Sequence, residues 1–161
     1  GRSPYVIIAH NVFGAEMEKH AIVAKAMLIC THNGKVLLQK HKDQKKGFDF
    51  YRLLGGHIEF SERSDKAIRR ELMEELHTRI SGLKLEGVLE NMFEMDGKKG
   101  HEIVFVYSGK LLNKELYKHD ELERDEDGKK KKAYWVPFAI VKREKSRVYP
   151  KGVYSMISKH A

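Results

Sequence analysis

The sequence has little of several features that would place it in a specialised class of protein. It holds one cysteine, Cys30, among 161 residues, which excludes an internal disulfide and favours a reducing, cytoplasmic setting. No apolar run approaches the roughly 20 residues needed to span a bilayer. The nine histidines show no zinc-type spacing, so we expect no structural zinc site. These absences predict a cytoplasmic protein with no membrane partner.

The sequence also has fewer acidic than basic side chains. The 23 Asp and Glu residues stand against 31 Lys and Arg residues, which gives a formal charge of +8. This balance admits nucleic acid or phosphate-bearing small molecules as partners. Much of the excess lies in lysines of expected loops, so a solvated surface is the simpler interpretation. These lysines are Lys42, Lys45, Lys46, Lys98, Lys99 and residues 129–132.

No linker divides the chain, and a hydrophobic fraction of 41% is enough for one domain with a core. We expect this domain to span residues 17–161, because Met17 opens a more regular pattern than the residues before it. Residues 1–16 are interpreted as a leader that is either artificial or processed. The alternative is an ordered strand at residues 5–9, a run too short for the apolar core of a signal peptide.

Strands are expected on both sides of a central helix. Residues 21–30 and 35–39 flank an Asn-Gly pair, which supplies the positive φ angles of a tight hairpin turn. Residues 40–49 are polar and are expected to form a loop beside a site. Residues 50–54 then predict a short strand that leads into a pair of glycines.

The second half predicts a hairpin from residues 84–95 and 102–108, whose β-branched and aromatic content is typical of strands. Residues 111–127 are expected to be an acid-rich loop with at most a helical turn. Its carboxylates are interpreted as solvated, with a further catalytic carboxylate as the alternative: Glu121, Glu123, Asp125 and Glu126. A strand at residues 133–136 and helices at 138–142 and 152–160 follow. The whole predicts a mixed α/β fold.

The central helix is expected to begin near Ser64, a good N-cap residue. Its apolar stripe, expected to face a core, has i, i+4, i+8 spacing: Ile68, Leu72 and Leu76. Another face carries Glu71, Glu74 and Glu75, which are neighbours at i+3 and i+4. Like charges at this spacing destabilise an isolated helix by roughly 0.2–0.5 kcal/mol per pair. We therefore expect a cation at this acidic face.

The helix completes a longer pattern: Gly56, five residues, Glu62, seven residues, then Arg70-Glu71-Leu72-Met73-Glu74-Glu75. This resembles the Nudix box, G-x5-E-x7-R-E-U-x-E-E-x-G-U with U a bulky apolar residue, and every position through Glu75 matches. His77 and Thr78 depart from it, where the family has glycine and an apolar residue. Either His77 adopts the left-handed conformation or the helix runs on toward Gly82. Neither outcome moves the acidic face.

The resemblance implies a Nudix-like α/β/α sandwich with a mixed β-sheet. It also implies a hydrolase that cleaves the diphosphate linkage of a nucleoside diphosphate derivative with Mg²⁺ or Mn²⁺ as cofactor. The implied metal ligands are the Gly55 carbonyl, Glu71, Glu74 and Glu75. The implied catalytic set is Glu62, Arg70, Glu71 and Glu75, with Glu62 and Arg70 as an ion pair and Glu71 as either a third ligand or the base.

The physical chemistry of the acidic face agrees with this resemblance. Carboxylates brought close together raise one another's pKa unless a cation offsets the repulsion. Hard oxygen ligands suit Mg²⁺, which prefers a site shared between one or two carboxylates, water and substrate phosphates. Such an ion neutralises phosphate charge and lowers the pKa of a bound water. Hydrolysis of a diphosphate needs both effects.

Substrate contacts are expected outside the box, in the loops at residues 40–49 and 111–127. Phe48 and Tyr51, with Phe50 between them, are candidates to stack on a base, although burial in the core is an equal alternative. Glu102 begins a strong strand and is a weaker candidate to point a carboxylate at the acidic face.

Two other functions remain open from the sequence. One is a nucleotide- or RNA-binding module that keeps the scaffold without turnover, and the other is an RNA 5′-end pyrophosphohydrolase. A small nucleotide substrate is the expected partner, nucleic acid is the alternative, and a homodimer is compatible with the resemblance because many relatives form dimers.

Overall fold

The computed structural model describes residues 21–161. The expected leader at residues 1–16 and the alternative strand at residues 5–9 lie outside this range. The described strands are β1 (Ile22–Ile29), β2 (Thr31–His32), β3 (Lys35–Lys42), β4 (Asp49–Arg52), β5 (Leu54–His57), β6 (Ile80–Met95), β7 (Lys98–Leu111), β8 (Glu121–Glu126), β9 (Lys129–Pro137) and β10 (Val148–Tyr149). The helices are α3 (Ser64–Leu76), α4 (Phe138–Arg143) and α5 (Val153–Ser158), with 3-10 helices η1 (Lys114–Tyr117) and η2 (Lys145–Arg147).

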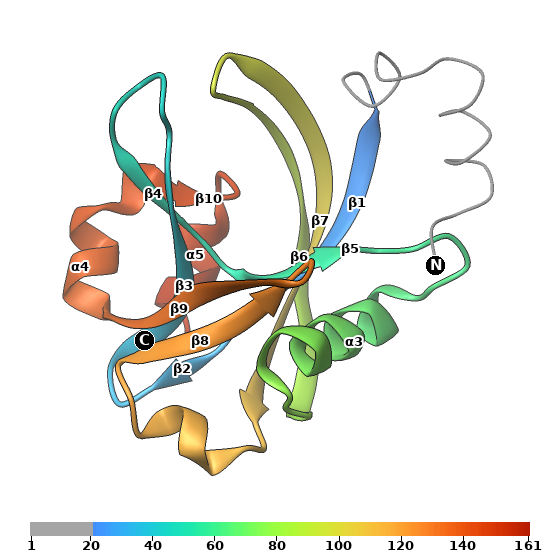
Figure 1. The fold of residues 1–161 in the computed structure, drawn as a ribbon, viewed down its shortest axis with the longest axis vertical. Coiled ribbons are helices and arrows are strands. Elements are labelled where there is room, and N and C mark those ends of the chain that lie inside the picture. Colours follow the sequence, from blue (N-terminus) through green and yellow to red (C-terminus); the bar gives the residue numbers. More distant parts are fainter. Residues whose placement is uncertain (1–20) are drawn as a thin grey trace.

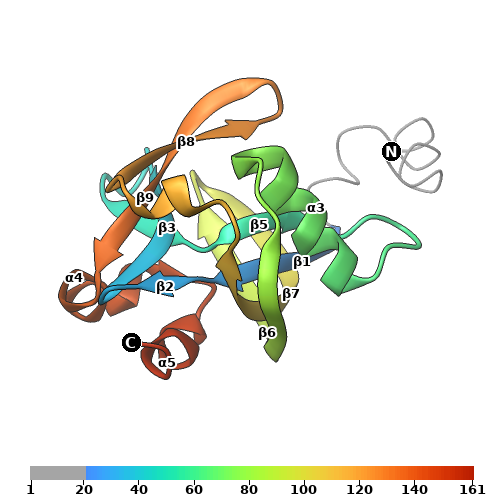
Figure 2. The same cartoon turned by 90° about the horizontal axis from the view of Figure 1, so that it is seen from below.

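The strands form two mixed sheets. One has the order β5-β1-β7-β6, in which β1 and β7 run parallel. The other has the order β10-β4-β3-β9-β8, with β2 attached to β3 and a parallel β10–β4 pair. Helix α3 lies on one side of the strands, and α4 and α5 lie on the other (Figure 2). The predicted α/β/α sandwich with mixed sheets is confirmed.

Two clusters of buried side chains join the layers. The cluster beneath α3 contains the predicted apolar stripe, Ile68, Leu72 and Leu76, and each such side chain contributes roughly 1.5–3 kcal/mol when fully buried. The cluster on the side of α5 contains Val104 and Val106, whereas Phe105 and Tyr107 belong to the α3 side. Strand β7 is therefore covered on both faces, which explains its continuous apolar sequence.

Two long hairpins, β3–β4 and β6–β7, diverge from the centre of the fold toward the same end of the molecule (Figure 1). Their tips are joined by hydrogen bonds. The backbone N–H of Gln44 donates to Asp96 Oδ1 at 2.8 Å, and Lys46 Nζ donates to the carbonyl of Glu94 at 3.1 Å. The space between the hairpins is therefore bounded at its outer end as well as at its base.

The expected loop at residues 40–49 is shorter than predicted. Strand β3 continues to Lys42, which pairs with Asp49 at the start of β4. The turn between them is held by the buried carboxylate of Asp43, whose Oδ1 accepts hydrogen bonds from the backbone N–H groups of Lys45 and Lys46. Residues 40–49 are polar, which is typical of a loop, yet part of this stretch belongs to a regular hairpin.

The helical turn predicted within residues 111–127 is present as η1, but the prediction of a loop for the rest of this stretch is wrong, because residues 121–126 form strand β8. Strand β8 pairs antiparallel with β9, from Glu121 opposite Tyr134 to Glu126 opposite Lys129. Acidic side chains of β8 form ion pairs with lysines of β9, at 2.5–2.8 Å: Asp125–Lys130, Glu126–Lys131 and Glu121–Lys132. Such cross-strand pairs stabilise a sheet surface and explain why so polar a segment is a strand.

Both ends of α3 are now defined. Ser64 is the first helical residue rather than the N-cap, and its hydroxyl forms a 2.6 Å hydrogen bond with that of Tyr107. His77 has φ 54° and ψ 43°, so it adopts the left-handed conformation and ends the helix. Of the two alternatives considered, the helix does not run on toward Gly82. Within residues 21–161, no helix is long and apolar enough to cross a membrane.

Candidate active site

The loop before α3 is attached to the helix by Arg70. Its Nε and Nη2 groups donate to the two carboxylate oxygens of Glu62 at 2.8 and 2.9 Å. Nη2 also donates to the carbonyl of His57 at 2.9 Å, which fixes the end of β5. The Arg70 hydrogen bonds, against the opposing effect of burial, hold the pKa of Glu62 below its usual value. The predicted Glu62–Arg70 ion pair is therefore present in bidentate form.

The glycine pair allows this loop to lie closely against its neighbours. Gly55 has φ 149°, and a Cβ there would lie 2.0 Å from the carbonyl oxygen of Ala26. A Cβ on Gly56 would lie 2.4 Å from the carboxyl carbon of Glu71. Any side chain at residue 56 would thus occupy the space of the Glu71 carboxylate. The Gly55 carbonyl as a ligand stays a prediction.

The three glutamates of the acidic face have different surroundings. Glu74 is exposed, Glu71 is half-buried and Glu75 is buried. Arg70 Nη1 donates to Glu71 at 2.9 Å and lies 3.3 Å from Glu74. Burial nevertheless raises the pKa of Glu71. One guanidinium is therefore shared by three carboxylates, counting Glu62, and leaves this face net negative.

Glu75 is the most constrained of the three. Its Oε1 accepts a 2.9 Å hydrogen bond from Nη1 of Arg124, whereas its Oε2 is buried without a hydrogen-bond partner. Burial raises the pKa of Glu75 to about 8, against the opposing effect of Arg124. A buried carboxylate oxygen with no partner is costly, and the cost disappears when a cation lies against it.

Arg124, on β8, contacts Glu75 of the candidate site and was not predicted from the sequence. Its side chain is 2% exposed, and it also donates to Gln39 Oε1 at 2.9 Å and to the carbonyl of Lys132 at 3.1 Å. The signal that could have found it is the Asp-Gly pair at residues 127 and 128, which predicts a hairpin and hence a strand at β8.

The donors at this face fit a hard divalent cation. The buried, unpartnered Oε2 of Glu75 and the close approach of Glu71 to Gly56 both supply oxygen-lined space. Within residues 21–161, no three acidic, histidine or cysteine side chains already converge as a complete metal cage. Glu71, Glu74 and Glu75 are therefore not assembled as a three-carboxylate site in the described residues, and their role as metal ligands stays a prediction.

Glu102 does not join the acidic face. Its carboxylate is 1% exposed and lies 2.7 Å from Lys25 Nζ and 2.9 Å from Arg52 Nη2. Asn91 Nδ2 also donates to it at 3.1 Å. Because side chains alternate along a strand, Glu102 shares the face of Val104, away from α3. Its expected role as a direct substrate contact is therefore not supported by its position.

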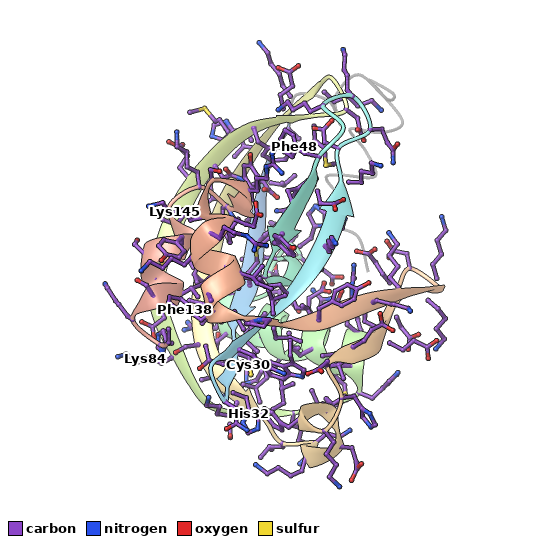
Figure 3. All side chains as sticks on the ribbon, turned by 90° about the vertical axis from the view of Figure 1, so that its left-hand side faces the viewer. Cys30, His32, Phe48, Lys84, Phe138 and Lys145 are labelled. Atoms are coloured by element: carbon purple, nitrogen blue, oxygen red, sulfur yellow. The ribbon has the colours of Figure 1, made fainter. Side chains whose placement is uncertain are left out.

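The three aromatic residues near the β3–β4 turn do not share one environment. Phe48 and Phe50 line a groove between the two hairpins that is open to solvent. Tyr51, one residue further, packs against the core cluster on the side of α5 and does not line the groove. Phe48 lies at the end of the molecule opposite Cys30 and His32 (Figure 3).

Comparisons with known proteins agree with this geometry. The family model described as "NUDIX domain" matches residues 19–155. A NUDIX family hydrolase from Clostridium perfringens is 19% identical, with a TM-score of 0.58 over 86% of this chain and 95% of that one. A NUDIX hydrolase from Nitrosomonas europaea is 16% identical, with a TM-score of 0.56 over 86% of this chain and 87% of that one. A MutT NUDIX hydrolase from Burkholderia pseudomallei is 18% identical, with a TM-score of 0.54 over 74% of this chain and 86% of that one.

At these identities the structures establish the fold, whereas the family model spans most of the sequence and includes the loop and helix described above. The chain belongs to the NUDIX domain family of hydrolases.

Proposed function

We propose that this protein hydrolyses the diphosphate linkage of a nucleoside diphosphate derivative with Mg²⁺ or Mn²⁺. The observation that carries the proposal is the Oε2 atom of Glu75, a buried carboxylate oxygen without a partner on a face that holds two further carboxylates. An unsatisfied buried carboxylate oxygen lowers stability, and a cation bound at this face would remove that cost.

The residues that would hold the metal are Glu71, Glu74, Glu75 and the carbonyl of Gly55. When bound, the ion would neutralise charge on the diphosphate and lower the pKa of the attacking water. Arg70 keeps Glu71 and Glu74 in place through its Nη1 group, and its bond to Glu62 holds the loop against α3. This arrangement fixes the carboxylates before substrate arrives.

Glu71 has a second role open to it. Its carboxylate is half-buried and has a raised pKa, which makes it a better proton acceptor than an exposed glutamate. It either completes the metal site or takes the proton from the attacking water. Because Gly56 leaves the space for its carboxylate, both roles depend on the glycine at that position.

The basic composition gives little support to the RNA alternative. Lys130, Lys131 and Lys132 of β9 form ion pairs with acidic side chains of β8, so most of the lysine run is not free to bind phosphate. A nucleotide-binding module without turnover is also less favoured, because every carboxylate of the box is present, with Glu71, Glu74 and Glu75 on α3 and Glu62 in the loop before it.

The proposal is tested by product release from a substrate panel with Mg²⁺ or Mn²⁺. The panel holds ADP-ribose-like compounds, oxidised nucleoside triphosphates, dinucleoside polyphosphates and 5′-triphosphate RNA. We expect metal-dependent turnover of a small nucleotide that falls sharply in Glu74→Gln and Glu75→Gln. Glu115→Gln, an exposed glutamate on η1, is the control and should match the parent. Equal turnover by all four proteins would refute the assignment.

A further inference from the structure

Gln39 and Arg124 join the two elements that carry the proposed metal ligands. Arg124 Nη1 donates to Glu75 Oε1 on α3 at 2.9 Å, and Arg124 Nη2 donates to Gln39 Oε1 at 2.9 Å. Gln39 Nε2 in turn donates to the carbonyl of Leu53 at 2.8 Å. Leu53 precedes β5, and Gly55 follows two residues later. A continuous row of hydrogen bonds therefore runs from the chain beside the Gly55 carbonyl to the carboxylate of Glu75.

This row of hydrogen bonds is buried along its length. The side chain of Arg124 is 2% exposed, and Gln39, Leu53 and Glu75 are buried as well. Arg124 Nε also donates to the carbonyl of Lys132 on β9 at 3.1 Å, so each of its three nitrogens has an acceptor. A buried polar network whose hydrogen bonds are made holds its members in one arrangement. The guanidinium is therefore fixed by β3 and β9 before any cation binds.

The contact with Arg124 also restricts the unpartnered oxygen of Glu75. The two oxygens of a carboxylate share one plane, so an arginine that holds Oε1 limits where Oε2 lies. This Oε2 is buried and has no hydrogen-bond partner. A glutamate side chain otherwise has several rotamers, and selecting one of them on metal binding would cost conformational entropy. Arg124 makes this selection in advance.

We infer that Arg124 and Gln39 are positioning residues of the metal site. Together they hold the Oε2 atom of Glu75 in a fixed relation to the glycine loop. A guanidinium has only donors and cannot bind a cation, so Arg124 acts through Glu75. Gln39 acts through Arg124 and Leu53, to which its oxygen and its amide nitrogen are bound. The inference rests on the proposed function, since it concerns the same metal site.

The experiment measures the Mn²⁺ affinity of the full chain by electron paramagnetic resonance of the free ion, together with the unfolding free energy without metal. The first variant is Arg124→Lys, which keeps a positive charge beside Glu75 but lacks the planar fork. Because the charge is unchanged, a change in affinity reports geometry rather than electrostatics. We expect the Mn²⁺ dissociation constant to rise at least about ten-fold, as for other residues that support a metal ligand. Arg143→Lys, the same change at an exposed arginine on α4, should bind Mn²⁺ as the parent does.

Gln39→Met is a second test, which leaves Arg124 itself unaltered. The methionine side chain is similar in length and uncharged, and it makes neither hydrogen bond of the Gln39 amide. We expect a smaller rise in the Mn²⁺ dissociation constant, of about three-fold or more. The double variant Arg124→Lys with Gln39→Met should lose about as much affinity as Arg124→Lys alone, because both changes break the same row of contacts.

Affinities are compared under conditions in which circular dichroism shows each variant to be folded. If both residues only stabilised the fold, their variants would lose unfolding free energy and keep the parent's Mn²⁺ affinity, and that result would overturn the inference. Fully additive losses of affinity in the double variant would overturn it as well. If Arg124→Lys does not fold, the affinity of Gln39→Met alone decides. Those results would leave metal-dependent hydrolysis standing, whereas equal turnover by Glu74→Gln and Glu75→Gln would refute the hydrolysis and leave the comparison of Mn²⁺ affinities intact.

Discussion

Glu75 and Glu102 are both buried glutamates with an arginine partner, yet their surroundings are opposite. Glu102 is surrounded by Lys25, Arg52 and Asn91, so both of its oxygens are engaged. Burial alone would raise its pKa, but Arg52 and Lys25 outweigh that effect and hold it below the usual value. Glu75 has one oxygen on Arg124 and one with no partner, and burial raises its pKa to about 8.

This difference separates two uses of a buried charge. A carboxylate whose hydrogen bonds are complete ties strands together and orients the arginine beside it. A buried carboxylate in which one oxygen has no hydrogen-bond partner is instead available to bind a cation. We therefore assign Glu102 to the support of Arg52 and Glu75 to the metal.

The largest effect is expected on stability, from Glu102→Gln. Lys25 and Arg52 would keep their burial and lose the carboxylate that both contact. Breaking a buried ion pair from one side costs about 3–5 kcal/mol of unfolding free energy. Urea denaturation at pH 7 measures this loss. A change below about 1 kcal/mol would show that Glu102 does not support the cations as described.

Glu75→Gln should change stability little and reduce activity strongly. Glutamine can still accept from Arg124, which retains Glu126 at 3.4 Å, so the unfolding free energy should change by less than about 1 kcal/mol. The rate of metal-dependent hydrolysis should fall at least about 100-fold, equivalent to about 2.7 kcal/mol of barrier. If Glu75→Gln lost as much unfolding free energy as Glu102→Gln and kept the parent's rate of hydrolysis, the assignment of Glu75 to the metal would be contradicted.

A smaller loss of activity is expected from Gly56→Ala, whose Cβ would displace the Glu71 carboxylate. We expect a reduction of about ten-fold in hydrolysis rate, since misplacement by about 1 Å can cost up to 100-fold. The matched control is the double variant Gly56→Ala with Glu71→Ala, in which no Glu71 carboxylate remains to be displaced. The second change should then have little further effect, and additive losses would mean that the clash lies elsewhere.

The smallest effect is the pH dependence of the Glu102 contribution. Because the folded pKa of Glu102 is lowered, its stabilisation is fully present above the ordinary glutamate pKa of about 4.3. It is lost as the pH falls further, through the folded pKa. The stability difference between the parent and Glu102→Gln should therefore shrink between pH 4.5 and pH 3. A difference that stays constant over this range would contradict the lowered pKa.

Much of the acidic face could be predicted from the sequence because its parts are local. Glu62, Arg70 and Glu71 lie within ten residues of one another, and helical spacing alone places the glutamates on one face. The ion pair of Glu62 with Arg70 follows from the same short stretch, which left the helix end open between a left-handed His77 and a helix continuing toward Gly82.

The partners of the two buried glutamates could not be predicted in this way. Arg124 lies 49 residues from Glu75, and Arg52 lies 50 residues from Glu102, so only the assembled sheets bring them together. Strand alternation predicts that Phe50 and Tyr51 point to opposite faces, but not which face meets the groove. The polar composition of β8 concealed a strand whose stability comes from lysines on its neighbour.

The central claim is that Glu75 keeps an oxygen for a divalent cation. The most direct measurement is Mn²⁺ binding, followed by electron paramagnetic resonance of the free ion, in the parent, Glu75→Gln and the Glu115→Gln control. We predict that Glu75→Gln raises the dissociation constant at least about ten-fold while the control matches the parent. Equal Mn²⁺ affinity in all three proteins would contradict the claim.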